Sequence, residues 1–127
     1  MVVNDNSTDK TAEIVLDFAK ENPFITLVNK TSETIHLPGS KVIQAFQKGF
    51  ETLDDNYDLI VKLDADLIFP PNYFETIIKH FQSDSTIGMA GGFCYIEKNG
   101  DWILENLTDK DHIRGALKAY RKATFQQ

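Results

Sequence analysis

The chain has little cysteine, no long apolar run and no basic cluster, and each of these absences narrows what it can be. Its one cysteine, Cys94, cannot form an internal disulfide, which favours a reducing compartment and predicts a cytoplasmic location. No apolar stretch approaches the roughly 18 residues that a membrane-spanning helix needs, and no signal peptide is recognised. The formal net charge is −6, without the Lys/Arg surface that a phosphate backbone demands, so nucleic acid is excluded as the main partner.

What remains is the composition of an ordinary globular domain. The chain has 127 residues, of which 42% are apolar and 25% charged, enough for one domain with a core. No repeat, low-complexity tract or internal linker divides it, so residues 1–127 are predicted to form a single domain. Residues 1–3 run straight into a polar turn, and residues 123–127 resemble the first turn of an unfinished helix. We therefore expect a domain that lacks sequence at both ends.

The spacing of apolar residues predicts helices that alternate with strands. The phenylalanines lie mostly on the predicted helices, and we assign them to the core. Alternation of this kind is typical of an α/β fold with a mostly parallel sheet. The predicted helices are 8–22, 40–53 and 72–81, the strands are 24–28, 58–63, 87–90 and 113–121, and residues 93–104 form a hairpin that turns at Asn99-Gly100.

The most informative pattern is a pair of aspartates directly after an apolar run. Residues 59–63 predict a buried strand, and Asp64-Ala65-Asp66 follows it. Side chains two residues apart in an extended chain point to the same side, at the strand end where open α/β sheets bind ligands. Two hard oxygen donors there suit Mg²⁺ or Mn²⁺, with a phosphate completing the shell. The plainer alternative is that both aspartates merely end the strand and cap the next element.

A second polar segment, residues 4–9 (NDNSTD), lies at another strand-to-helix junction. In a parallel sheet this turn lies at the same edge as the aspartate pair, and a carboxylate there can accept hydrogen bonds from a nucleobase or a ribose. The alternative is a polar turn that only caps the following helix. A calcium loop of the EF-hand type is excluded, because Lys10 stands where Gly is needed and Leu16 where a bidentate Glu is needed.

Together the two segments resemble the family 2 glycosyltransferases, which have the GT-A fold. Residues 2–11 (VVNDNSTDKT) are similar to the first nucleotide-binding turn of that family, and residues 63–66 (LDAD) to its metal-binding D-x-D motif. The resemblance covers essentially the whole chain. It implies a GT-A (Rossmann-like) three-layer sandwich truncated at both ends. Within it, residues 1–90 would bind the nucleotide-sugar, and residues 91–127 would begin the acceptor side.

The resemblance also implies roles for individual residues. Asp5 would contact the base of a nucleotide-sugar donor. Asp64 would reach the ribose or the metal, and Asp66 would hold Mn²⁺ or Mg²⁺ against the diphosphate. Lys41 could approach a phosphate, with a solvated lysine at a helix start as the commoner alternative. Asn4 departs from the acidic residue that the family pattern has there, keeping an acceptor but losing the charge.

The acceptor side is less defined by the resemblance. His112, Arg114 and Gly115 are similar to an acceptor-side segment of related polysaccharide transferases, although a paired surface strand is an equal alternative. In this family an Asp from the C-terminal half serves as the general base. The pattern places that residue beyond Gln127, so no catalytic residue is assigned within the chain.

The implied function is sugar transfer from a nucleotide-diphosphate donor to a saccharide or lipid-linked saccharide acceptor. The resemblance implies that the transfer is metal-dependent and inverting, and that it serves cell-surface polysaccharide synthesis at the inner face of a membrane. The alternative is a catalytically inert fragment of such an enzyme, which self-associates as a homodimer through an uncovered sheet edge.

Overall fold

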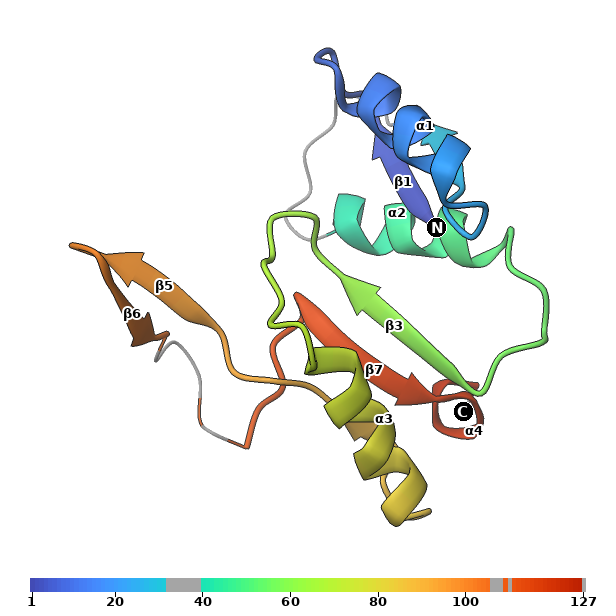
Figure 1. The fold of residues 1–127 in the computed structure, drawn as a ribbon. Helices are drawn as coiled ribbons and strands as arrows, with labels where there is room; N and C mark the ends of the chain where they lie inside the picture. The colour runs from blue at the N-terminus through green and yellow to red at the C-terminus, as the bar shows by residue number, and fades with distance from the viewer. Residues whose placement is uncertain (32–39, 106–108, 110, 127) are drawn as a thin grey trace. The chain divides into compact units, whose positions relative to one another are not determined.

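The structure is a computed structural model that describes residues 1–31, 40–105, 109 and 111–126. These residues form two compact units, Met1–Asp55 and Asn56–Gln127 (Figure 1). The predicted loop before the second helix falls mostly outside the described residues, as does the end of the C-terminal segment.

The first unit combines a two-stranded parallel sheet with two helices. Its strands pair in register from Val2 opposite Leu27 to Asp5 opposite Lys30. Gly49 lets the second helix approach the first strand closely, since a Cβ at this position would lie 2.7 Å from Val3 Cγ2. No apolar side chain among the described residues of this unit is fully buried. The elements are β1 (Val2–Asp5), α1 (Thr11–Glu21), β2 (Leu27–Lys30) and α2 (Ser40–Phe50).

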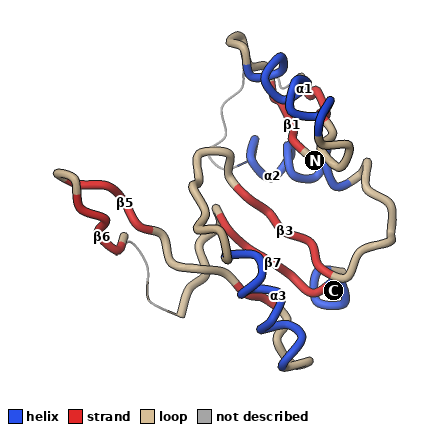
Figure 2. The backbone as a smooth tube through the Cα atoms, viewed as in Figure 1, coloured by secondary structure: helices blue, strands red, loops and turns tan. Residues whose placement is uncertain are grey.

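The second unit is built on a three-stranded sheet with the order β3-β7-β4. Its strands β3 and β7 lie side by side in Figure 2. The central strand β7 runs antiparallel to both of its neighbours. Ile77 and Phe81 of α3 pack with Ala119 of β7 to form the core, which adjoining residues of β3 and β4 extend. The elements are β3 (Leu59–Leu63), α3 (Tyr73–Ser83), β4 (Met89–Ala90), β5 (Tyr95–Lys98), β6 (Asp101–Leu104), β7 (Leu117–Arg121) and α4 (Lys122–Phe125).

Arg121, the last residue of β7, fastens the end of α3 to the sheet. Its guanidinium donates hydrogen bonds to the carbonyl oxygens of Phe81 at 2.7 Å, Ile87 at 3.0 Å and Asp84 at 3.2 Å. It also lies over the Phe81 ring, 5.2 Å from the ring centre. The last carbonyls of a helix have no partner within the helix, so a cation there is favourable.

The predicted hairpin is confirmed, with its strands β5 and β6 paired antiparallel from Tyr95 opposite Leu104 to Lys98 opposite Asp101. Asn99 and Gly100 both have positive φ, at 57° and 87°. Asn-Gly is the pair that a two-residue turn with two left-handed positions favours.

The expected α/β class is confirmed, but the described strands do not form the expected mostly parallel sheet. Their one parallel pair is β1–β2. Residues 113–121 were predicted as one strand, yet only Leu117–Arg121 is extended, and it returns antiparallel along β3. β3 belongs to the sheet β3-β7-β4 and β1 to the sheet β1-β2, so the described strands form separate small sheets.

Several predicted core residues are exposed instead. Of the four apolar residues predicted to face inward from α3, Ile77 and Phe81 are buried, whereas Phe74 and Ile78 are exposed. Phe18 of α1 is 62% exposed. The apolar stripe of each helix is thus wider than the sheet surface that it covers. In the part of the chain that the structure describes, no helix has both the length and the apolar character to cross a membrane.

Candidate functional site

The aspartate pair lies where the sequence predicts, directly beyond the end of β3. The β3–β7 ladder ends with Leu63 opposite Leu117, and the Asp64 amide continues it by donating to the Ala116 carbonyl at 2.8 Å. Asp64 is half-buried and Asp66 is exposed. The backbone of the first aspartate is therefore fixed by the sheet, while the second presents its carboxylate to solvent.

Lys62 is the partner that sequence reasoning missed. Its ammonium donates to Asp64 Oδ1 at 2.6 Å and to the Gly115 carbonyl at 2.8 Å. Residues 62 and 64 are two apart on an extended segment, so their side chains share a side. A lysine inside an otherwise apolar strand, two residues before an acid, is the signal that could have found it. Lys62 offsets one negative charge of the pair and ties Asp64 to the loop before β7.

The structure therefore brings Gly115 to the aspartate pair through Lys62. The neighbouring Arg114 forms an ion pair with Glu105 in which both side chains are largely covered. The His112 amide donates to the Asp109 carbonyl at 2.9 Å. Residues 113–116 are thus a loop and not the paired strand that was the alternative for this segment. An acceptor role for the segment stays a prediction.

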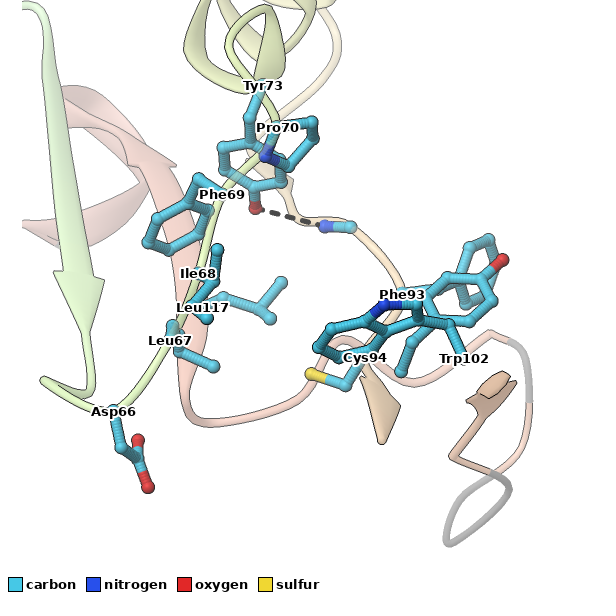
Figure 3. Close-up of a pocket in the computed structure, with 12 residues that line it drawn as sticks. Asp66, Leu67, Ile68, Phe69, Pro70, Tyr73, Phe93, Cys94, Trp102 and Leu117 are labelled. Atoms are coloured by element: carbon cyan, nitrogen blue, oxygen red, sulfur yellow. Dashed lines mark hydrogen bonds between the residues drawn. The ribbon is translucent and has the colours of Figure 1, made fainter. Parts of the chain in front are cut away.

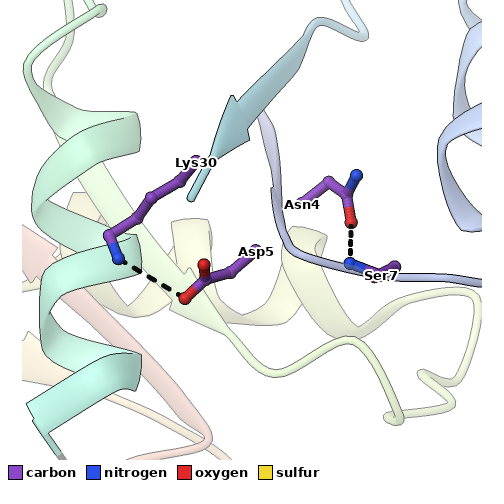
Figure 4. A network of polar contacts seen from close by, with 4 residues as sticks. All are labelled: Asn4, Asp5, Ser7 and Lys30. Atoms are coloured by element: carbon purple, nitrogen blue, oxygen red, sulfur yellow. Dashed lines mark hydrogen bonds and ion pairs between the residues drawn. The ribbon is translucent and has the colours of Figure 1, made fainter. Parts of the chain in front are cut away.

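The polar turn after β1 is held by its own side chains (Figure 4). Asn4 Oδ1 accepts a hydrogen bond from the Ser7 amide at 3.2 Å, and Asn6 adopts a positive φ of 60°, which Asn tolerates better than most residues. Just before α1, Asp9 Oδ1 accepts hydrogen bonds from the amide of Thr11, the first helical residue, at 2.9 Å and from the Thr11 hydroxyl at 2.5 Å. These hydrogen bonds lower the pKa of the Asp9 carboxyl.

Asp5 points away from that network toward β2 (Figure 4). One of its carboxylate oxygens lies 3.4 Å from Lys30 Nζ, and both side chains are mostly covered, at 19% and 15% exposure. Sequence reasoning missed Lys30, which the parallel register places directly opposite Asp5. The ion pair with Lys30 orients the Asp5 carboxylate.

The remaining predicted donor residue, Lys41, is half-buried in the first turn of α2. Asp5 and Lys41 belong to the unit Met1–Asp55, whereas Asp64 and Asp66 belong to Asn56–Gln127. The structure thus joins Asp64 with Lys62 and Gly115, and Asp5 with Lys30. The assignment of all four predicted residues to one donor site stays a prediction.

The donor chemistry of the aspartate pair fits a hard divalent cation. Carboxylate oxygens are ligands that Mg²⁺ and Mn²⁺ prefer, and Mg²⁺ is commonly held by one or two carboxylates with substrate phosphates and water. Among the described residues, no group of three or more His, Cys, Asp or Glu side chains is arranged to hold a metal. A metal at Asp64 and Asp66 would therefore take its other ligands from substrate and water.

Beside Asp66 opens a cavity of about 610 Å³ that sequence reasoning did not predict (Figure 3). Tyr73 lies on its wall, and the Tyr73 hydroxyl accepts a hydrogen bond from the Gly92 amide at 3.2 Å. Burial raises the pKa of Tyr73. Cys94 is half-buried just before β5 and lines the same cavity.

Comparison with known proteins agrees with the resemblance that the two motifs carry. The family model "Glycosyl transferase family 2" matches residues 1–126. The chain belongs to the family 2 glycosyltransferases, as its motifs predicted.

Two curated relatives come from Trichomonas vaginalis. Dolichyl-phosphate beta-glucosyltransferase ALG5A is 36% identical over 83 residues, which cover 65% of this chain and 23% of the relative. Dolichyl-phosphate beta-glucosyltransferase ALG5C is 31% identical over 121 residues, which cover 95% of this chain and 30% of the relative. The chain thus spans less than a third of the length of these relatives. No solved structure is a significant match.

Proposed function

We propose that this chain is the donor-binding part of an enzyme that transfers a sugar from a nucleotide-diphosphate donor to a lipid-linked acceptor. The observation that carries the proposal is the Asp64–Asp66 pair at the end of β3, in a chain that matches the family over residues 1–126. The lipid-linked class of acceptor follows the two relatives, whose names specify dolichyl phosphate. Family membership also supports the GT-A fold for the complete domain.

Each predicted residue has a role in this proposal. Asp5, held by Lys30, accepts hydrogen bonds from the donor's base. Asp66 and Asp64 bind Mn²⁺ or Mg²⁺, with Asp64 also within the reach of a ribose hydroxyl, and Lys41 attracts a phosphate. The cation would neutralise the charge that builds on the leaving diphosphate. A solvated Lys41 stays the alternative for that residue.

The acceptor hydroxyl or phosphate attacks the sugar from the side opposite the leaving group, which inverts the anomeric centre. A hydroxyl needs a general base for its proton, and we place that base beyond Gln127. The chain then binds and orients the donor, while another segment of the enzyme completes the transfer. We place the reaction in the cytoplasm, at the inner face of a membrane, where lipid-linked saccharides for the cell surface can be made.

Isothermal titration of the chain with UDP and with GDP tests this proposal. We expect binding of one nucleotide in Mn²⁺ that weakens at least tenfold in EDTA. Asp66→Asn should lose that metal dependence, whereas Asp101→Asn, at an exposed aspartate that begins β6 of the hairpin, should keep it. Equal affinity with and without metal, or unchanged metal dependence in Asp66→Asn, would overturn the metal assignment.

A second candidate is an inert fragment that self-associates. It is favoured by the exposed apolar side chains of the first unit, among them Phe24 at 80% and Ile43 at 67% exposure. Large exposed apolar side chains mark association surfaces when they gather in a patch. Light scattering after size exclusion distinguishes the two candidates, because a monomer that binds nucleotide excludes the second one.

A further inference from the structure

The cavity beside Asp66 is bounded by three parts of the second unit. One wall is the segment 66–70 that follows the aspartate pair, and the opposite wall carries Phe93, Cys94 and Trp102 (Figure 3). Leu117 contributes from the start of β7. Asp66 lies at the end of its segment farthest from Tyr73 (Figure 3). The cavity therefore begins at a proposed metal ligand and extends away from it.

The cavity walls are apolar side chains held open to solvent on a fixed backbone. Ile68 is 87% exposed, and Phe93 and Trp102 are each 62% exposed. The Gly92 amide bonds the Tyr73 hydroxyl, and the Glu105 amide bonds the Cys94 carbonyl at 2.9 Å, so the opposite wall is tied at two points. Exposed apolar surface of this kind marks a binding site, and about 610 Å³ is within the usual range for a small-molecule pocket.

The chemistry of the lining selects the ligand. Of the lining residues, Asp66 alone carries a charge, and it is negative. A phosphate inside the cavity would thus have no cation to pair with. A sugar, whose hydroxyls all need partners, would find side-chain donors or acceptors only at Asp66, Tyr73, Cys94, Tyr95 and Trp102, and the other seven lining residues offer none. An apolar chain meets neither obstacle, and its polar head would remain at the Asp66 end, beside the carboxylates of Asp64 and Asp66 that would hold a divalent cation.

We propose that this cavity binds the first isoprenoid units of a polyprenyl-phosphate acceptor, with the acceptor's phosphate directed to the Asp66 end. The inference rests on the proposed function and deepens it, by locating the lipid part of the acceptor. It assigns Phe93 and Trp102 of the hairpin segment a role in acceptor selection.

The cavity contains two natural reporters. Trp102 is the only tryptophan of the chain and Cys94 its only cysteine, and both line the cavity. A bound apolar chain removes water from the indole, which shifts its emission to shorter wavelength, and it shields the thiol from alkylation. Both signals are independent of sugar transfer.

The probes are farnesyl phosphate below its micellar concentration, farnesol, inorganic phosphate and maltose. We expect farnesyl phosphate and farnesol to shift the Trp102 emission and to slow iodoacetamide alkylation of Cys94 at least fivefold, and the two polar probes to do neither. Geranyl phosphate should bind at least tenfold more weakly than farnesyl phosphate, because each buried methylene strengthens binding about fourfold. Protection by maltose or by inorganic phosphate would overturn the proposal, as would no response to farnesyl phosphate.

Two variants distinguish lipid binding in the cavity from nonspecific binding to exposed apolar side chains. Phe93→Ser should weaken farnesyl phosphate binding at least fivefold, measured by the Trp102 emission, and its high exposure makes it tolerable to the fold. Phe24→Ser, an exposed phenylalanine of the other unit, should leave binding unchanged. Equal effects of the two variants would contradict the assignment.

The same samples are titrated with UDP or GDP and Mn²⁺, so that two kinds of failure can be told apart. If farnesyl phosphate does not bind while nucleotide does, the lipid site is wrong and the proposed function stands. If nucleotide does not bind, the proposed function is wrong whatever the lipid does.

Discussion

The two units of this chain differ in how many buried apolar side chains accompany their polar residues. Asn56–Gln127 buries the apolar side chains of Ile60, Ile77, Phe81, Leu117 and Ala119, whereas the described part of Met1–Asp55 fully buries no apolar side chain. A two-stranded parallel sheet offers little surface for helices to cover, and parallel sheets normally have both faces covered. The aspartate pair is thus built on a packed core, and the Asp5 turn on local hydrogen bonds.

The largest expected difference between the units comes from removing one phenylalanine from each. Phe81→Ala should lower the free energy of unfolding by about 3–5 kcal/mol, because Phe81 is 4% exposed and carries Arg121 on its ring. Phe18→Ala, at 62% exposure, should change it by less than about 0.5 kcal/mol. Urea unfolding, monitored through amide hydrogen exchange in each unit, measures the two changes in the free energy of unfolding. If the two substitutions lowered the free energy of unfolding by similar amounts, the first unit would have a core of its own, which would contradict this comparison.

A smaller loss of stability is expected when the hydrogen bonds from Arg121 to the end of α3 are removed. Arg121→Gln should cost about 2–3 kcal/mol, because the carbonyls of Phe81 and Asp84 lose a charged donor. Lys79→Gln is the matched control on the same helix, since its pair with Glu75 is exposed and worth under about 0.5 kcal/mol. Faster exchange of the α3 amides in Arg121→Gln alone would confirm the role. Equal costs for both variants would contradict it.

One glycine in each unit, Gly91 and Gly49, lies so close to its neighbours that an added Cβ would clash with them. Gly91→Ala should cost about 1–3 kcal/mol, because its Cβ would lie 2.6 Å from the Leu117 carbonyl oxygen, which belongs to a fixed strand. In Gly49→Ala the new Cβ meets only side chains, those of Val3 and Met1, and the clash is offset by a gain in helix propensity of about 1 kcal/mol. Gly115→Ala, with nothing within 4 Å, is the control. A greater cost at Gly49 than at Gly91 in thermal unfolding would reverse the ranking.

The smallest effect is a pH dependence that both units share. Hydrogen bonds from Thr86 lower the pKa of Asp84, as those from Thr11 lower the pKa of Asp9. A carboxyl with a lowered folded-state pKa stabilises the fold above its ordinary value near 3.9, and this stabilisation is lost as the pH falls through the lowered value. The midpoint for Asp84, followed by carboxyl ¹³C shifts, should rise in Thr86→Val. An unchanged midpoint would exclude the hydroxyl as the cause.

Local patterns in the sequence predicted much of this structure. Apolar spacing located the main helices to within a few residues, Asn99-Gly100 predicted the hairpin, and the run 59–63 predicted β3 with the aspartates at its end. These features depend on a few neighbouring residues, which is why they can be read directly. The family resemblance was equally local, since it rested on two short motifs.

What the sequence could not predict depends on partners far along the chain. The antiparallel return of β7 gives Asp64 its backbone partner and Lys62 its second acceptor, and neither contact has a local signal. Lys30 becomes the partner of Asp5 only through the register of β1 with β2. The cavity joins residues 66–70 to a hairpin more than twenty positions later. The exposure of Phe18 likewise reflects how little sheet lies beneath α1.

We propose that Asp5 and the Asp64–Asp66 pair each contribute to binding of the nucleotide-sugar donor, and that this binding depends on metal. Backbone NMR of the chain, titrated with UDP or GDP in Mg²⁺ and then in EDTA, tests it most directly. We predict metal-dependent shifts at residues 64–67 and, in the same titration, at residues 4–7. Shifts confined to one unit, or shifts in both that persist unchanged in EDTA, would contradict the claim.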